Sequence, residues 1–134
     1  MKITITGPAL LAKPLAVKKA LTQSALLVES SAKLNCPVET GTLRRSITHE
    51  FISEDTIQVG TNMDYAPYVE YGTGLFAEAG DGRQDVPWRY QDADGNWHTT
   101  SGQHPQPFMR PALEDNKKNI IDIFNEQINR YTGG

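Results

Sequence analysis

The stretch Val59-Gly-Thr-Asn-Met-Asp-Tyr-Ala-Pro-Tyr-Val-Glu-Tyr-Gly-Thr-Gly74 holds three tyrosines, one proline and three glycines, directly after a strand-like run. Glycine and proline set turns in the backbone, and tyrosine joins a large apolar ring to a polar tip. The stretch contains no Cys, His, Lys or Ser that could serve as a nucleophile or a base. It therefore predicts an architectural corner that orders a surface, and it does not predict a reaction centre.

A short helix is expected inside this stretch, from Tyr65 to Tyr71. Asp64 is the expected N-cap, and Gly72 is expected to end the helix. Pro67 falls early in the segment, where a missing amide hydrogen is tolerated. The corner is therefore expected to contain one or two helical turns.

The segment before the corner begins with a strand-like run, Met1 to Thr6, and continues as a long helix. We expect Pro14 in the first turn of this helix and an end near Asn35, because Pro37 keeps the residue before it out of the helical region. Apolar residues recur at steps of three and four, which is typical of one buried helix face. They are Val17, Leu21, Ala25, Val28 and Ala32, widened by Leu11, Leu15, Leu26 and Leu27.

A β-hairpin is expected between the long helix and the corner. A turn at Thr40-Gly41-Thr42 leads into a strand from Leu43 to Phe51. The polar turn Ser53–Asp55 then returns the chain along a second strand, Thr56 to Gly60. Alternation along both strands predicts one shared apolar face, formed by Ile47, Phe51, Ile57 and Val59.

The segment after the corner predicts a loop, a second hairpin and a final helix. Residues 75–85 are rich in Gly, Asp and Ala and show no periodicity. Asp92-Ala-Asp-Gly95 is a strong turn signal between strand-like runs, so Trp88 and Trp97 are expected to pair across the ribbon. A helix from Pro111 to about Tyr131 is expected to bury Leu113, Ile120, Ile121, Phe124 and Ile128, and to expose Asn116, Lys117, Lys118, Asn119, Asp122 and Glu126.

These elements predict one α+β domain over residues 1–134: an antiparallel sheet of two hairpins, two long helices packed on one face, and a short connecting helix. The loop at about residues 72–86 is expected to be mobile, and residues 132–134 are expected to fray. The sequence contains no internal repeat, and we expect no second domain.

Composition narrows the possible functions. The chain has 38% apolar and 22% charged residues and a net charge of −3, which argues against a protein that grips nucleic acid through its phosphates. Its single cysteine excludes an internal disulfide and fits a reducing cytoplasm. No run has the roughly 18 to 20 apolar residues that a membrane span requires, and the N-terminus lacks the pattern of a secretory signal.

Catalytic and metal-binding patterns are weak. His98 and His104 are six residues apart and have no Cys-x-x-Cys partner, so we expect no metal. Asp92, Asp94 and their neighbours fit turn chemistry better than a calcium loop. No nucleophile has a base in reach, since Ser46 and His49 would point to opposite faces of a strand. We therefore expect neither enzymatic activity nor a cofactor.

Three blocks carry a resemblance to a known family. They are Pro37-Val-Glu-Thr-Gly-Thr-Leu-Arg-Arg-Ser-Ile47, Tyr65-Ala-Pro-Tyr-Val-Glu-Tyr-Gly-Thr73 and Pro105-Gln-Pro-Phe-Met-Arg-Pro-Ala112. In this order and spacing the chain resembles the head–tail joining (tail completion) proteins of long-tailed double-stranded DNA bacteriophages. Residues 75–101 follow no pattern of that family and are expected to be particular to this chain.

The resemblance implies a structural protein of the phage neck, made in the host cytoplasm and placed at the head-proximal end of the tail. There it would form a ring, commonly of six copies, around the DNA path, and contact the head connector and the tail tube protein. DNA would pass through the ring without tight binding. A tail-tube terminator is the nearest alternative, and a small nuclease or DNA-binding protein is the alternative of another class.

Ten residues are the candidate interface positions. Arg44 or Arg45 is expected to pair with Glu70, either between subunits or within the domain. Two of the three corner tyrosines are expected to pack in the core and one to face a partner. Phe108 and Met109, between prolines, are expected to anchor the chain before the last helix. The candidate set is Arg44, Arg45, Tyr65, Tyr68, Glu70, Tyr71, Trp88, Trp97, Phe108 and Arg110.

Overall fold

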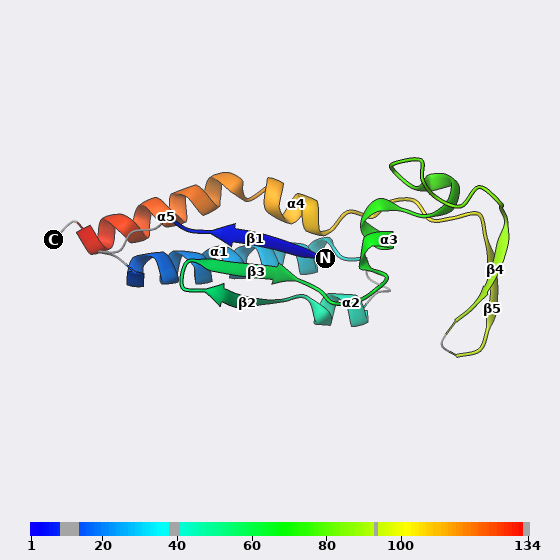
Figure 1. The fold of residues 1–134 in the computed structure, drawn as a ribbon, viewed down its shortest axis with the longest axis horizontal. Helices are drawn as coiled ribbons and strands as arrows, with labels where there is room; N and C mark the ends of the chain where they lie inside the picture. Colours follow the sequence, from blue (N-terminus) through cyan, green and yellow to red (C-terminus); the bar gives the residue numbers. More distant parts are fainter. Residues whose placement is uncertain (9–13, 38–40, 93, 133–134) are drawn as a thin grey trace. The chain divides into compact units, whose positions relative to one another are not determined.

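The computed structural model describes residues 1–8, 14–37, 41–92 and 94–132. The chain forms two compact units (Figure 1). The first unit consists of Met1–Met63 and Phe108–Gly134, and the second consists of Asp64–Pro107. We call them the core unit and the inserted unit.

The core unit contains a three-stranded antiparallel sheet in the order β1-β3-β2. These strands are β1 (Lys2–Thr6), β2 (Thr48–Ser53) and β3 (Thr56–Gly60). Ile5 aligns with Ile57, and Ile57 aligns with Phe51, so these three side chains share the inner face of the sheet. The opening strand-like run is thus the third strand of this sheet.

Helix α1 (Pro14–Asn35) packs on the inner face, where it contacts all three strands (Figure 1). The predicted stripe is confirmed: Val17, Leu21, Ala25, Val28 and Ala32 are all buried. The predicted widening of that stripe is wrong, because Leu15 and Leu26 are about half exposed and Leu27 is only partly buried. The sheet and helices α4 and α5 cover part of the α1 surface, and these leucines lie on the part that stays in solvent. Leu11 lies outside the described residues.

The strand predicted from Leu43 to Phe51 is partly wrong. Its first half is helix α2 (Gly41–Ser46), and the strand begins only at Thr48. Leu43 and Ile47 are both buried, and their spacing of four residues fits a helical turn as well as strand alternation. The Ser46 hydroxyl donates to the Leu43 carbonyl oxygen at 2.6 Å, which closes this turn locally. The hairpin turn between β2 and β3 is confirmed.

The last helix is interrupted where one continuous helix was expected. Helix α4 (Met109–Glu114) ends before Asn116, and helix α5 (Lys117–Thr132) follows it. Asn116 was expected in solvent, but it is buried, and its amide donates to Ser31 Oγ and to the Ala112 carbonyl oxygen, both at 2.8 Å. An asparagine that competes for backbone acceptors favours a break in a helix.

The stripe predicted for this last helix is only partly buried. Ile121 is 60% exposed, whereas Leu113, Ile120, Phe124 and Ile128 are half-buried. Helices α4 and α5 pack mainly against α1. The position that α5 buries most fully is Gln127, whose amide donates to Gln23 Oε1 of α1 at 3.1 Å.

The inserted unit contains α3 (Ala66–Tyr71), the 3₁₀ turn η1 (Gly74–Phe76), β4 (Trp88–Gln91) and β5 (Trp97–Thr100). Strands β4 and β5 form a separate two-stranded sheet, so the α+β class is confirmed but the two hairpins do not share one sheet. The predicted pairing of the two tryptophans is wrong. Trp88 aligns with Thr100, and Trp97 aligns with Gln91, at opposite ends of the ribbon.

Candidate assembly surface

The inserted unit is closed at its base by two chain segments that are far apart in the sequence. The Thr73 amide donates to the Gln103 carbonyl oxygen at 2.9 Å, and the Leu75 amide donates to the Ser101 carbonyl oxygen at 3.0 Å. The Gln103 amide returns a bond to Thr73 Oγ1 at 2.9 Å. We call this junction of residues 73–75 with residues 101–103 the clamp.

Glycine is required on both sides of the clamp. Gly74 has φ +60° and Gly102 has φ +125°, which are conformations that side-chain-bearing residues rarely adopt. A Cβ on Gly74 would meet the Ser101 carbonyl oxygen, and a Cβ on Gly102 would meet the Thr73 carbonyl oxygen, both closer than atoms can approach. The Gly-Thr-Gly end of the corner is therefore explained by backbone packing.

A further hydrogen bond, next to the clamp, joins two of the sequence blocks. The Gln106 amide, in the Pro-Gln-Pro block, donates to the Val69 carbonyl oxygen of α3 at 2.8 Å. This contact was not predicted, because nothing in the composition of the two blocks indicates pairing over more than 30 residues. Their contact fixes the two ends of residues 75–101 side by side.

Helix α3 ends as expected and begins differently. Gly72, with φ +82°, is the C-cap, and Pro67 lies in the first turn. Tyr65, not Asp64, is the N-cap, and no side chain caps the helix there, so the predicted Asp64 cap is wrong. The expected burial of two tyrosines is also wrong. Tyr65, Tyr68 and Tyr71 are 39%, 60% and 42% exposed, because a helix of six residues has little core to cover.

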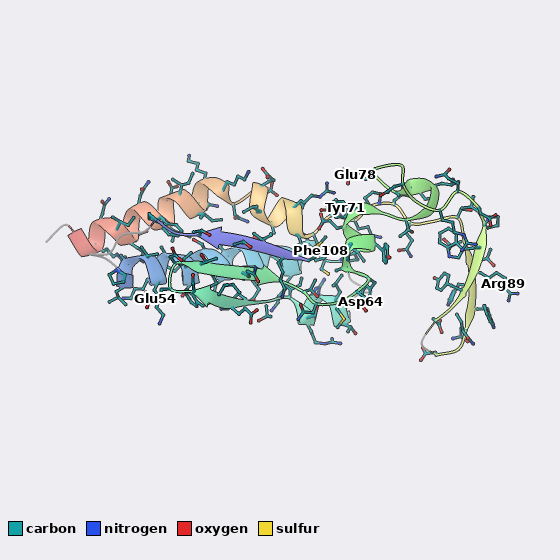
Figure 2. All side chains as sticks on the ribbon, in the orientation of Figure 1. Glu54, Asp64, Tyr71, Glu78, Arg89 and Phe108 are labelled. Carbon is teal, nitrogen blue, oxygen red and sulfur yellow. The ribbon has the colours of Figure 1, made fainter. Side chains whose placement is uncertain are left out.

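The β4–β5 hairpin exposes aromatic residues on both faces. On one face the Arg89 guanidinium lies 4.9 Å from the centre of the Trp97 ring, and Figure 2 shows the Arg89 side chain projecting from β4. On the other face the Tyr90 and His98 rings stack at 5.1 Å, and the Arg83 guanidinium lies 5.1 Å from the Trp88 ring. Trp97 is 59% exposed. These pairs hold the rings in place but do not bury them.

Asp92 organises the tip of this hairpin. Its carboxylate accepts the Asn96 and Asp94 amides at 2.9 and 3.0 Å and lies 2.7 Å from His98 Nε2. The hydrogen bond from His98, and then that from the Asn96 amide, lower the pKa of Asp92 below its ordinary value of 3.8. The predicted turn function of this residue is thus confirmed by its geometry.

The remaining candidates lie on different elements. Arg44, which lies on α2, donates from Nη2 to the Cys36 carbonyl oxygen at 3.1 Å, and the exposed Arg45 donates to Thr42 Oγ1 at 3.4 Å. Both arginines therefore lie on a helix and not on the predicted strand. Glu70 is fully buried, and its pairing with an arginine stays a prediction. Phe108 is fully buried, and Arg110 is half-buried on α4.

One feature of the core unit was not predicted from the sequence. Phe51 is 40% exposed at the outer edge of the sheet, although it lies on the inner face. It lines an open groove of about 640 Å³ together with Pro14, Leu15, Lys18, Ser53 and Glu54. Lys18 Nζ lies 6.0 Å from the centre of the Phe51 ring. Strand alternation gave the correct face for Phe51 but could not show that β2 is an edge strand.

Within the described ranges, no three His, Cys, Asp or Glu side chains converge as a metal site. None of the helices in that part of the chain combines the length and apolarity that a membrane crossing needs.

Comparison with known proteins supports a viral origin. Residues 14–72 match the model of the HK97-gp10-like family, described as "Bacteriophage HK97-gp10, putative tail-component". The match agrees with the resemblance to phage head–tail joining proteins and covers α1 to α3, ending at the C-cap of α3. No curated protein and no solved structure matches the chain. The match indicates similarity to a phage tail component over this part of the chain.

Proposed function

We propose that this protein forms a ring at the head-proximal end of a phage tail and joins the tail to the head connector around the DNA path. The family match over residues 14–72 supports the tail assignment. The position in the neck comes from the resemblance of the three sequence blocks, the third of which lies beyond the matched residues.

One observation carries the docking part of this proposal. In the described part of the chain, the inserted unit provides seven of the thirteen exposed large hydrophobic side chains. They are Tyr65, Tyr68, Tyr71, Leu75, Phe76, Tyr90 and Trp97. Exposed aromatic residues of this density mark interaction sites, and Tyr, Trp and Arg dominate interface energetics. The inserted unit is therefore the surface that meets the partner ring.

The sheet of the core unit suits a passage for DNA. Its outer face carries Thr4, Thr56 and Gln58 with one charge of each sign, Lys2 and Glu50. A face without net charge offers phosphates no strong attraction, and the chain as a whole is acidic. DNA could then slide past without being held. A tight, salt-sensitive affinity of the purified protein for duplex DNA would contradict this part.

The test is head–tail joining in vitro with purified heads and with tails that lack this protein. We expect the wild-type chain to restore infectious particles, and the double variant Tyr68→Ser/Trp97→Ser to reduce their number at least tenfold. Leu26→Ser/Leu34→Ser is the matched control, because both leucines are exposed on α1 of the core unit. Equal joining by the two double variants would contradict the assignment of the docking surface.

A pull-down with the connector protein and with the tail tube protein separates joining from tail termination. Capture by the connector is expected for a joining protein. Capture by the tube protein alone would favour the terminator instead.

A further inference from the structure

The three-stranded sheet of the core unit has two open edges. Met1 and Thr61 exchange both backbone hydrogen bonds at 3.0 Å, and the Gly7 amide donates to the Asp55 carbonyl oxygen at 2.7 Å. Because hydrogen-bonded pairs alternate along an antiparallel ladder, Ile3 and Ile5 direct their backbone groups toward β3. The backbone groups of Lys2, Thr4 and Thr6 therefore point away from the sheet.

The same alternation defines the other edge. On β3, residues 57 and 59 face β1, so residues 58 and 60 face β2. Thr48 and Glu50 of β2 bond to them, and the backbone groups of His49 and Phe51 point outward. Across the described residues, no backbone hydrogen bond reaches these outward groups at either edge. Open edges of this kind recruit further strands unless they are blocked.

We propose that β2 of one copy of this protein pairs with β1 of the next copy, so that the sheet continues from subunit to subunit around the ring. The inference rests on the proposed ring and names the surface that builds it. Both strands are antiparallel to β3 and thus parallel to each other. Pairing of two different edges is a head-to-tail contact, which closes into a ring when the rotation allows.

The side chains at the two edges are complementary. On the inner face, the exposed Phe51 of β2 would lie beside Ile3 or Ile5 of the next copy, and the groove next to Phe51 and Leu15 would be covered. On the outer face, Glu50 of β2 would come near Lys2 of the next copy. Two-fold pairing of β2 with β2 would instead place two Glu50 side chains on one face and leave Lys2 without a carboxylate.

Engineered disulfides test the pairing. In a Cys36→Ala background we would prepare the single variants Thr4→Cys, Glu50→Cys and Gln58→Cys, which all lie on the outer face. Each of these chains carries a single cysteine, so any disulfide joins two chains. An equimolar mixture of Thr4→Cys and Glu50→Cys chains, oxidised at the highest soluble concentration, is expected to give a covalent dimer.

The controls define the outcomes. Neither single variant alone should give a dimer, and Thr4→Cys mixed with Gln58→Cys should give none, since β3 is central. A dimer from Glu50→Cys alone would show two-fold pairing and overturn the proposal. Oligomers in native mass spectrometry without the mixed cross-link would overturn the edge pairing but leave the ring intact. No oligomer, either free or on tails, would overturn both.

A proline variant gives a second readout. Thr4→Pro removes an amide hydrogen that points outward, so it should reduce oligomer formation at least tenfold while the monomer stays folded. Thr4→Val is the matched control, because it removes the hydroxyl and keeps the amide. Equal oligomer formation by the two variants would count against pairing through this edge.

Discussion

The core unit and the inserted unit are stabilised by different kinds of interaction. Of the seventeen buried hydrophobic residues in the described part of the chain, only Ala66 lies in the inserted unit. The core unit is stabilised by burial of α1 against the sheet, whereas the inserted unit is closed by backbone hydrogen bonds at the clamp. Segments with few buried apolar contacts open at lower free energy than a core. The unit that holds the apolar core and the unit proposed to dock on the partner ring are therefore separate.

The largest expected effect is in the core unit. Leu21 is fully buried on α1, so Leu21→Ala should lower the free energy of unfolding by about 2 to 5 kcal/mol. Leu26→Ala, on the same helix but 45% exposed, should cost less than about 1 kcal/mol. Urea denaturation followed by circular dichroism measures both. Similar costs for the two variants would show that α1 is not packed as described.

The clamp provides the second test. Gly74→Ala and Gly80→Ala both place a side chain at positive φ, +60° and +71°, which costs about 1 to 2 kcal/mol. A Cβ at Gly80 meets nothing within 4 Å, whereas one at Gly74 meets the backbone of residues 101 and 102. We expect Gly74→Ala to accelerate amide exchange at Leu75 and Thr73 at least tenfold more than Gly80→Ala does. Equal exchange in the two variants would refute the clamp.

The sequence predicted the core unit better than the inserted unit, for a physical reason. Apolar periodicity reports burial, so the stripe of α1 and the turn between β2 and β3 could be found from residue spacing. The type of a short element is harder to predict. The spacing of Leu43 and Ile47 fits a helical turn and a strand equally well. The break at Asn116 depends on Ser31, 85 residues away, which periodicity cannot reveal.

The candidate assembly surface could be predicted only in part. Composition marked the corner tyrosines and the hairpin turn at Asp92–Gly95 as features of a surface. It could not show that all three tyrosines are exposed, because burial depends on what else packs nearby. The clamp was not predicted, since its bonds join residues 26 to 30 positions apart and only one of them uses a side chain.

A smaller effect isolates one bond of the clamp. Thr73→Val removes the Oγ1 that accepts the Gln103 amide and keeps the β-branched shape of the side chain. We expect a local cost of about 1 kcal/mol, seen as roughly fivefold faster exchange of the Gln103 amide. Thr42→Val is the control, because among the described residues Thr42 Oγ1 accepts a 3.4 Å bond on the exposed side of α2. Unchanged exchange at Gln103 would mean that the backbone bonds alone hold the clamp.

The smallest effect concerns the tip of the hairpin in acid. The pKa of Asp92 is lower in the folded hairpin than the 3.8 of the free carboxyl, so folding favours the ionised form. This contribution is fully present above pH 3.8 and is lost as the pH falls through the lower, folded value. In an NMR titration, the Trp97 indole and Asn96 amide signals should therefore shift as the turn loosens below that pH.

Two variants assign the acid transition to Asp92. Asp92→Asn should abolish it, and Asp94→Asn should keep it, because Asp94 contributes its backbone amide and not its carboxylate to the turn. An acid transition that survives Asp92→Asn would mean that a carboxyl group other than Asp92 controls the tip.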